Sequence, residues 1–292
     1  MTSPASAQPS GHGHRARARV AAEFIAGRTR CSTLRNDPPL TFRETSGGLI
    51  WIGTAAGPVG GDRLALEVEV GRGAHLHVTS AAASLVQPGP WGERSRLDLD
   101  LSIAAGGSLH WAPEPTVVFA GADHDARTRV TVGAGADLVL VEVLVLGRCG
   151  EAPGRLRWRI DVDGDVGPVL RTGLDIGAPG WDGACGLANH RTTGQVLLLG
   201  VPAQRWADGG ANAVAVACAD QEVRWADMAL ASGGVLVSVL GTGAPAVQAV
   251  VGTVTELARP DTGRAAGSTT GPTVRPPVGA GVAEIVGRRR SL

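Results

Sequence analysis

The sequence predicts a mainly β protein, in which stacked strands and hairpins form an elongated, layered, β-helix-like core with one or two helices near the C-terminus. Three observations support this prediction: apolar and polar residues alternate with period two, a strand–turn–strand unit recurs, and a helical pattern comes late in the chain. Period-two alternation is typical of strands with one buried face. Repeats of this size usually stack and share one core. A sandwich of local hairpins is the structural alternative.

The recurring unit occupies the middle of the chain. Its three copies span residues 63–78, 96–111 and 127–141, and each consists of an alternating run, a Gly-rich turn and a second short run. The glycines permit a tight chain reversal. We therefore expect two strands joined by a turn in every copy. A fourth, weaker copy spans residues 156–170 and turns at Asp163-Gly164.

The last elements are expected in a stretch without charged residues between Asp227 and Glu256. Glycines and a proline interrupt this stretch, whereas a membrane-spanning helix needs about 20 predominantly apolar residues. We predict a strand over 235–240 and then a helix over 246–258. Five apolar side chains fall at helical spacing in that helix: Val247, Val250, Val251, Val254 and Leu257.

Composition divides the chain into three parts. Residues 1–20 are rich in small residues, Pro and Arg, and we expect a disordered N-terminal tail. Residues 21–259 carry the strand patterns and are expected to form a single domain. Residues 260–292 are expected to form a flexible tail rich in Gly, Pro and Arg. No apolar signal-peptide core follows the N-terminal arginines, so we expect a cytoplasmic protein with no membrane association.

Charge and residue usage exclude several classes of function. The chain has 27 basic and 27 acidic residues, and this balance argues against a nucleic-acid partner. It contains no Lys and no Tyr, which excludes Schiff-base chemistry, a P-loop lysine and a tyrosine acid or base. The four cysteines form no C-x-x-C pair, so neither a zinc ribbon nor a thioredoxin-like site is expected.

Four segments, in this order, resemble landmarks of the UreD (UreH) family of urease accessory proteins. They are GGDRL at residues 60–64, TSAAA at 79–83, WAPEPTVVF at 111–119 and EVLVLGRCGE at 142–151. They are similar to the family's GGD-x-L, T-x-x-A, L-P-E-P-x-x-x-F and E-x-x-x-x-G-R…G-E patterns. The resemblance is good over about residues 47–151 and looser elsewhere.

The resemblance implies a non-enzymatic assembly factor with a β-helical fold. Such a protein works with UreF and the GTPase UreG to load nickel into urease apoprotein, and it offers the metal an internal, water-filled route. It binds no cofactor tightly, and nickel is only in transit. Two alternatives stay open: a β-rich hydrolase that uses Asp62, Glu114 and Glu142 as acid and base, or a binding module with no metal role.

Three carboxylates are candidates for the metal route. Glu142 shares its predicted strand face with leucines, where a carboxylate is costly to bury unless it is paired or hydrated. It either lines the internal passage or forms an ion pair, for example with Arg148. Glu114, between two prolines, either lines the same passage or accepts backbone hydrogen bonds. Asp62 follows a Gly pair and is expected to make a turn hydrogen bond in preference to binding metal.

Three histidines are further metal candidates. His75 and His77 project from one face of a predicted strand, and His110 takes the place of His77 in the next repeat. If the repeats stack, His77 and His110 become neighbours, and imidazoles suit nickel. The alternative is a solvated polar face.

Partner-binding candidates come from loop-like segments. Trp91 and Trp181 are flanked by Gly and Pro, and an exposed Trp is a common docking anchor. The alternative for each is a cap on the edge of the core. His190 and Arg191 lie in a polar loop that could also reach a partner.

Overall fold

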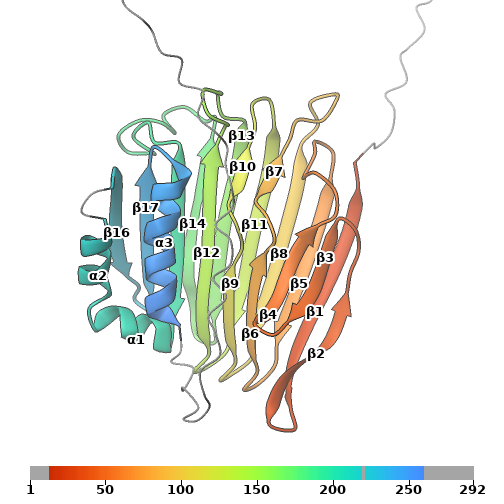
Figure 1. Cartoon of the computed structure of the whole chain (residues 1–292), viewed down its shortest axis with the longest axis vertical. Helices are drawn as coiled ribbons and strands as arrows, with labels where there is room; N and C mark the ends of the chain where they lie inside the picture. The colour runs from red at the N-terminus through yellow and green to blue at the C-terminus, as the bar shows by residue number, and fades with distance from the viewer. Residues whose placement is uncertain (1–12, 219–220, 260–292) are drawn as a thin grey trace, which may run out of the picture. The chain divides into compact units, whose positions relative to one another are not determined.

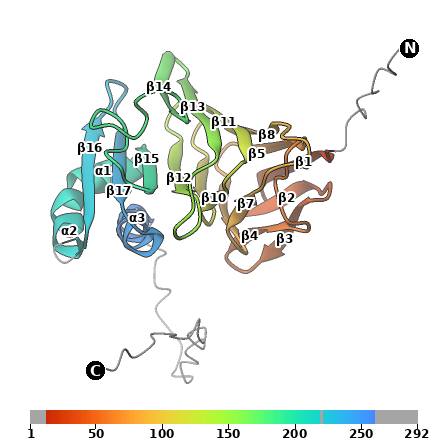
Figure 2. The same cartoon turned by 90° about the horizontal axis from the view of Figure 1, so that it is seen from above.

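The computed structural model describes residues 13–218 and 221–259, which belong to one compact unit. Two β-sheets face each other in this unit, and three helices lie at the end that carries the last strands (Figures 1 and 2). This arrangement confirms the prediction of a mainly β protein built from stacked strands.

Sheet A has seven strands in the order β14-β13-β11-β8-β5-β1-β2. Its neighbours from β13 to β1 pair in parallel, while β14 and β2 at the two edges pair antiparallel. In chain order its strands are β1 (Arg15–Ile25), β2 (Arg28–Arg35), β5 (Arg63–Val70), β8 (Ser95–Ile103), β11 (Asp123–Val132), β13 (Arg155–Gly164) and β14 (Gly167–Ile176).

Sheet B has ten strands, with a main path in the order β16-β17-β15-β12-β9-β6-β4-β3. The short strands β7 and β10 pair with each other, and β10 also pairs with β12. In chain order the strands are β3 (Leu40–Thr45), β4 (Gly48–Gly53), β6 (His75–Ser80), β7 (Ser84–Val86), β9 (Ser108–Ala112), β10 (Thr116–Val118), β12 (Asp137–Leu146), β15 (Thr192–Leu199), β16 (Val223–Ala229) and β17 (Val235–Gly241).

The three sequence repeats stack, but they are not hairpins. The first strand of each copy (β5, β8, β11) lies in sheet A, and the second (β6, β9, β12) lies in sheet B. Each strand pairs in parallel with its counterpart in the next copy. The glycine turns therefore arch from one sheet to the other, with Gly73, Gly106 and Gly135 at positive φ. Only the fourth copy is a true hairpin, formed by β13 and β14 within sheet A.

Two apolar layers hold the unit together. The larger layer fills the space between the sheets and includes Leu66, Leu101, Leu140 and Trp158. The smaller layer lies on the other face of sheet B, where Val141 packs with residues of helix α3. Strand β12 is thus buried on both faces, which explains its nearly continuous apolar sequence.

The C-terminal helical prediction is confirmed by α3 (Ala244–Ala258), and the predicted strand before it by β17. Two further helices, α1 (Val201–Ala207) and α2 (Gly210–Ala217), were not predicted. Both are short and rich in Ala and Val, so the sequence lacks a full amphipathic period there. Among the described residues, none of the helices is long and apolar enough to span a membrane.

The predicted N-terminal boundary is wrong. Strand β1 begins at Arg15, and its first residues pair in parallel with β5. Residues 15–20 alternate Arg with Ala or Val, and the small apolar side chains are buried while the arginines face outward. The rest of the predicted tail, residues 1–12, and the predicted tail at 260–292 lie outside the described residues.

Candidate functional site

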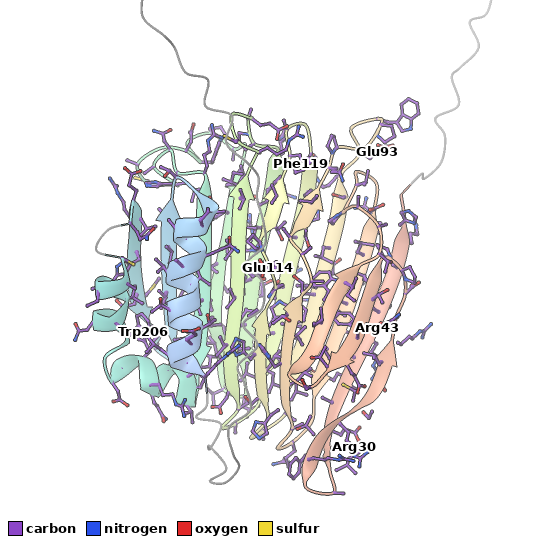
Figure 3. The ribbon with its side chains drawn as sticks, in the orientation of Figure 1. Arg30, Arg43, Glu93, Glu114, Phe119 and Trp206 are labelled. Carbon is purple, nitrogen blue, oxygen red and sulfur yellow. The ribbon has the colours of Figure 1, made fainter. Side chains whose placement is uncertain are left out.

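A small cavity lies between the two sheets and brings together two of the predicted carboxylates. Its walls include Glu142 from β12, Glu114 from the segment before β10, and three Trp rings, which are Trp51, Trp111 and Trp158. The cavity volume is about 50 Å³. Because one water needs roughly 10–15 Å³, this is room for a few waters. Figure 3 shows Glu114 near the middle of sheet B, beside α3.

Glu142 points into the core, as the alternation predicts. Its Oε1 accepts a hydrogen bond of 2.5 Å from Thr128 Oγ1, and its Oε2 accepts one from Trp158 Nε1. Both donors come from sheet A, so the carboxylate bridges the two sheets. Part of its surface stays exposed, and that part lines the cavity. Burial raises the pKa of Glu142, although the two donors oppose this effect.

The alternative ion pair of Glu142 with Arg148 is wrong. Arg148 pairs with Glu151 at 2.9 Å and lies over the ring of Phe119. None of the ion pairs among the described residues includes Glu142. A short turn after β12 directs Arg148 toward Glu151, three residues further along the chain. The carboxylate is therefore held by neutral donors alone.

Glu114 connects the cavity with the surface. Its side chain is exposed, and its Oε2 accepts a hydrogen bond of 3.2 Å from Gln248 Nε2 of α3. Its backbone N–H donates to Ser80 Oγ at 2.8 Å, which fixes the segment between the two prolines. Since Glu114 also lines the cavity, an acidic group lies both inside the cavity and at its border with solvent.

Asp62 makes the turn hydrogen bonds that the sequence predicts. The residue is 3% exposed, and its two carboxylate oxygens accept hydrogen bonds of 2.8 Å from the backbone N–H groups of His14 and Val59. It is not among the residues that line the cavity. The structure thus uses Asp62 to join β1 to the turn before β5.

The predicted contact between His77 and His110 is confirmed. The two residues are partners across β6 and β9, and their ring centroids are 4.5 Å apart in an edge-to-face arrangement. They lie on the face of sheet B opposite the core, so they do not line the cavity. His75 is exposed on the same face of β6. No group of three or more His, Cys, Asp or Glu side chains suited to a metal ion occurs within residues 13–218 and 221–259.

The alternative of a solvated polar face applies to His75, which is exposed, whereas His77 and His110 are half-buried. The pKa of His110 is lowered to about 4, mainly by burial and to a smaller extent by the nearby His77 and Arg259. Burial also lowers the pKa of His77, against the effect of a contact of its Nδ1 with Gly47 O. His77 Nε2 is buried without a hydrogen-bond partner among the described residues. Both imidazoles are therefore neutral at pH 7.

The partner-binding candidates differ in exposure. Trp91 is 66% exposed in the loop between β7 and β8. Trp181 instead packs partly against the core, and His190 Nδ1 contacts Leu187 O at 2.8 Å. The side chain of Arg191 is exposed, and its carbonyl accepts a hydrogen bond from Leu146 N. Trp91 and Arg191 are thus the two exposed candidates, whereas Trp181 and His190 are half-buried.

His124 lines the same cavity, although no sequence pattern identified it as a site residue. The residue is 1% exposed, and its Nδ1 lies 2.8 Å from Ser95 Oγ. The neighbouring Asp123 and Asp125 gave the segment a polar, solvent-facing character. However, His124 shares period-two spacing with Thr128, Val130 and Val132, and this signal places it on the buried face of β11.

Comparisons with known proteins give a consistent family. A family model described as "UreD urease accessory protein" matches residues 14–270. The chain is 40% identical to a Streptomyces avermitilis protein named urease accessory protein UreD, over 64% of this chain and 78% of that protein. It is 36% identical to a protein of the same name from a Parafrankia species, over 83% of this chain and 88% of that protein.

Proposed function

The chain belongs to the UreD family of urease accessory proteins and has a role in urease maturation, and from this premise we propose that it is a non-catalytic scaffold with an internal nickel passage. In this proposal it joins UreF and the GTPase UreG to the urease apoprotein in the cytoplasm. Nickel passes through it as cargo and not as a resident cofactor.

One observation supports the passage above all others: the buried carboxylate of Glu142 faces a water-sized cavity and has no cationic partner among the described residues. A buried carboxylate is costly unless its charge is compensated. Two neutral donors hold it in place without neutralising it. A divalent cation supplies the missing positive charge, so the cavity is suited to receive one.

The arrangement suits transit better than storage. Glu142 lies inside the cavity, Glu114 lies at its border with solvent, and no cluster of three metal-binding side chains closes around a single point in the described part of the chain. Tightly held structural metals usually have four protein ligands. Single carboxylates in a hydrated space hold a cation weakly and allow it to leave.

The hydrolase alternative fits the structure poorly. Asp62 is occupied in a turn, which leaves Glu114 and Glu142 as the carboxylate pair at the cavity. The cavity of about 50 Å³ has no room for a sugar ring between them, since ligand sites usually measure about 300–1,000 Å³.

The test is nickel transfer in a reconstituted maturation system. The full chain, Glu142→Gln and the control Glu69→Gln are each combined with UreF, UreG and urease apoprotein. Glu69 pairs with Arg19 on the outer face of sheet A, away from the cavity. We expect Glu142→Gln to retain partner capture while the nickel content of urease falls severalfold, and Glu69→Gln to match the wild type.

Two outcomes would contradict the proposal. Unchanged nickel transfer by Glu142→Gln, with normal capture, would overturn the passage and leave a binding module with no metal role. Failure of the wild-type chain to capture UreF or apo-urease would overturn the scaffold itself.

A further inference from the structure

His124 has a buried imidazole ring that is in hydrogen-bond contact with Ser95. It lies near the start of β11, between the two sheets, and lines the same cavity as Glu142. At 1% exposure, the residue is almost completely enclosed by the protein. An apolar side chain would fill this position in the core without a polar cost.

A short hydrogen-bond chain sets the tautomer of this imidazole. His124 Nδ1 lies 2.8 Å from Ser95 Oγ, and Ser95 Oγ lies 3.4 Å from the carbonyl oxygen of Asp123. A carbonyl can only accept, so the single hydroxyl proton of Ser95 is donated to Asp123. The Ser95 oxygen then accepts from His124, which places the imidazole proton on Nδ1.

This tautomer leaves Nε2 with a free lone pair. Among the described residues, Nε2 makes no hydrogen bond, and the residue lines the cavity. Burial lowers the pKa of His124 to about 4, so the ring is neutral at pH 7. Three carboxylates raise this pKa against the effect of burial: Asp125, Asp123 and Asp62.

We propose that His124 is a nitrogen ligand for a transition-metal cation in the cavity, held in the ligating tautomer by Ser95. This inference rests on the proposed metal passage and adds a second contact point to Glu142. Metal-binding histidines usually donate their other ring N–H to a neighbouring group, as Nδ1 does here. Imidazole nitrogen suits nickel, copper and zinc, whereas magnesium prefers oxygen ligands. His124 therefore gives the cavity its selectivity for transition metals.

The test measures metal binding by the full chain and does not depend on urease activity. Other imidazoles compete for metal, so all proteins carry His12→Asn, His14→Asn and His75→Asn. In this background, His124→Asn keeps a polar group near Ser95 and removes the Nε2 position. The matched control is His110→Asn, which removes an imidazole of similarly low pKa on the opposite face of sheet B.

Titration calorimetry with Ni²⁺ and with Mg²⁺ gives the affinities, and nickel X-ray absorption detects imidazole scattering. We expect His124→Asn to weaken Ni²⁺ binding about tenfold or more and to lose the imidazole signal, with Mg²⁺ binding unchanged. Ser95→Ala should weaken Ni²⁺ binding to a smaller extent, because the His124 proton is then no longer held on Nδ1 by the Ser95 hydroxyl. His110→Asn should behave as the background protein.

The outcomes separate this inference from the proposed passage. If Glu142→Gln weakens Ni²⁺ binding and His124→Asn does not, the passage stands and the role of His124 is overturned. If neither variant changes Ni²⁺ binding while both proteins keep the unfolding midpoint of the background, both proposals are overturned. An imidazole signal that is lost in His110→Asn and kept in His124→Asn also overturns the inference.

Discussion

Trp158 of β13 donates a hydrogen bond from Nε1 to the carboxylate of Glu142 on β12, and this bond crosses from one sheet to the other. The indole is 2% exposed and belongs to the main core. A bond between a neutral donor and a buried carboxylate orients the acidic group without neutralising its charge. Consequently, the same contact that joins the sheets keeps Glu142 directed toward the cavity.

Glu142→Gln is expected to change how stability depends on pH. The pKa of Glu142 is raised above 4.5 in the folded state by burial, so the unfolded chain releases this proton at a lower pH than the folded chain. The carboxyl therefore costs no stability below about pH 4.5, and its cost grows as pH rises toward the folded pKa. Gln removes this cost and can still accept from Trp158 and donate to Thr128.

Urea unfolding of wild type and Glu142→Gln between pH 4 and pH 8 measures this effect. The free energies of unfolding should differ least at pH 4, and the variant should gain relative to the wild type as pH rises. A constant difference across the whole range would show that Glu142 titrates normally.

Thr128→Val should destabilise the protein by about 1–3 kcal/mol. The substitution keeps the shape of the side chain but removes the hydroxyl that donates to Glu142, so a buried acceptor loses one of its two partners. Thr131→Val on the exposed face of the same strand is the matched control and should change stability by less than about 0.5 kcal/mol. Equal effects of the two substitutions on urea unfolding would contradict the prediction.

His110 should make the protein sensitive to acid. Its folded pKa of about 4 lies below the unfolded value of 6.5, mainly because of burial. Between these pH values, the unfolded chain binds a proton at His110 that the folded chain does not. The free energy of unfolding therefore has its full value above about pH 6.5 and decreases as the pH falls toward 4. The slope for one such group is at most about 1.4 kcal/mol per pH unit.

His110→Gln is therefore expected to flatten the loss of unfolding free energy between pH 6.5 and pH 4. His75→Gln, on the same face but exposed, is the control and should leave the slope as it is. A slope unchanged in both variants would assign the acid sensitivity to other groups.

Gly194→Ala should loosen the packing of α3 on sheet B. A Cβ at Gly194 of β15 would lie 2.8 Å from Val251 Cγ2 and 3.1 Å from Val247 Cγ1, both on α3. Overpacking of this kind costs about 1–3 kcal/mol. Gly252→Ala, on α3 with no atom within 4 Å of the added Cβ, should instead stabilise the protein by up to about 1 kcal/mol. Thermal unfolding of the two variants should shift in opposite directions, and a shared direction would refute the packing argument.

Trp91→Ala should weaken partner capture without affecting the fold. The side chain is largely exposed, and an aromatic anchor at a docking surface often contributes about 2 kcal/mol or more to binding. Trp181→Ala is the control. Because Trp181 packs partly against the core, this substitution should lower the unfolding midpoint and leave partner capture unchanged. Trp91→Ala should keep the wild-type unfolding midpoint and show at least about tenfold weaker capture of UreF or apo-urease. Normal capture would remove Trp91 from the docking surface.

Local patterns predicted much of the candidate site. Alternation along β12 placed Glu142 on the core face, and the spacing of the repeats placed His77 beside His110. Both results depend on one steric fact: successive side chains of a strand point to opposite faces. The same alternation along β11 directs His124 toward the core, but the adjacent Asp123 and Asp125 made the segment look solvent-facing.

The sequence itself determined the alternating segments, their buried faces, the family landmarks and the helix predicted over 246–258, which the structure extends to Ala244–Ala258. These features depend on backbone geometry and on residues near one another in the chain. Only the tertiary structure decided that the repeats arch between two sheets, that β1 pairs with β5, and that Thr128 and Trp158, not Arg148, hold Glu142. Strand partners and the contacts of a buried carboxylate depend on which apolar faces cover one another. That choice minimises exposed apolar surface over the whole chain, so no local segment contains it.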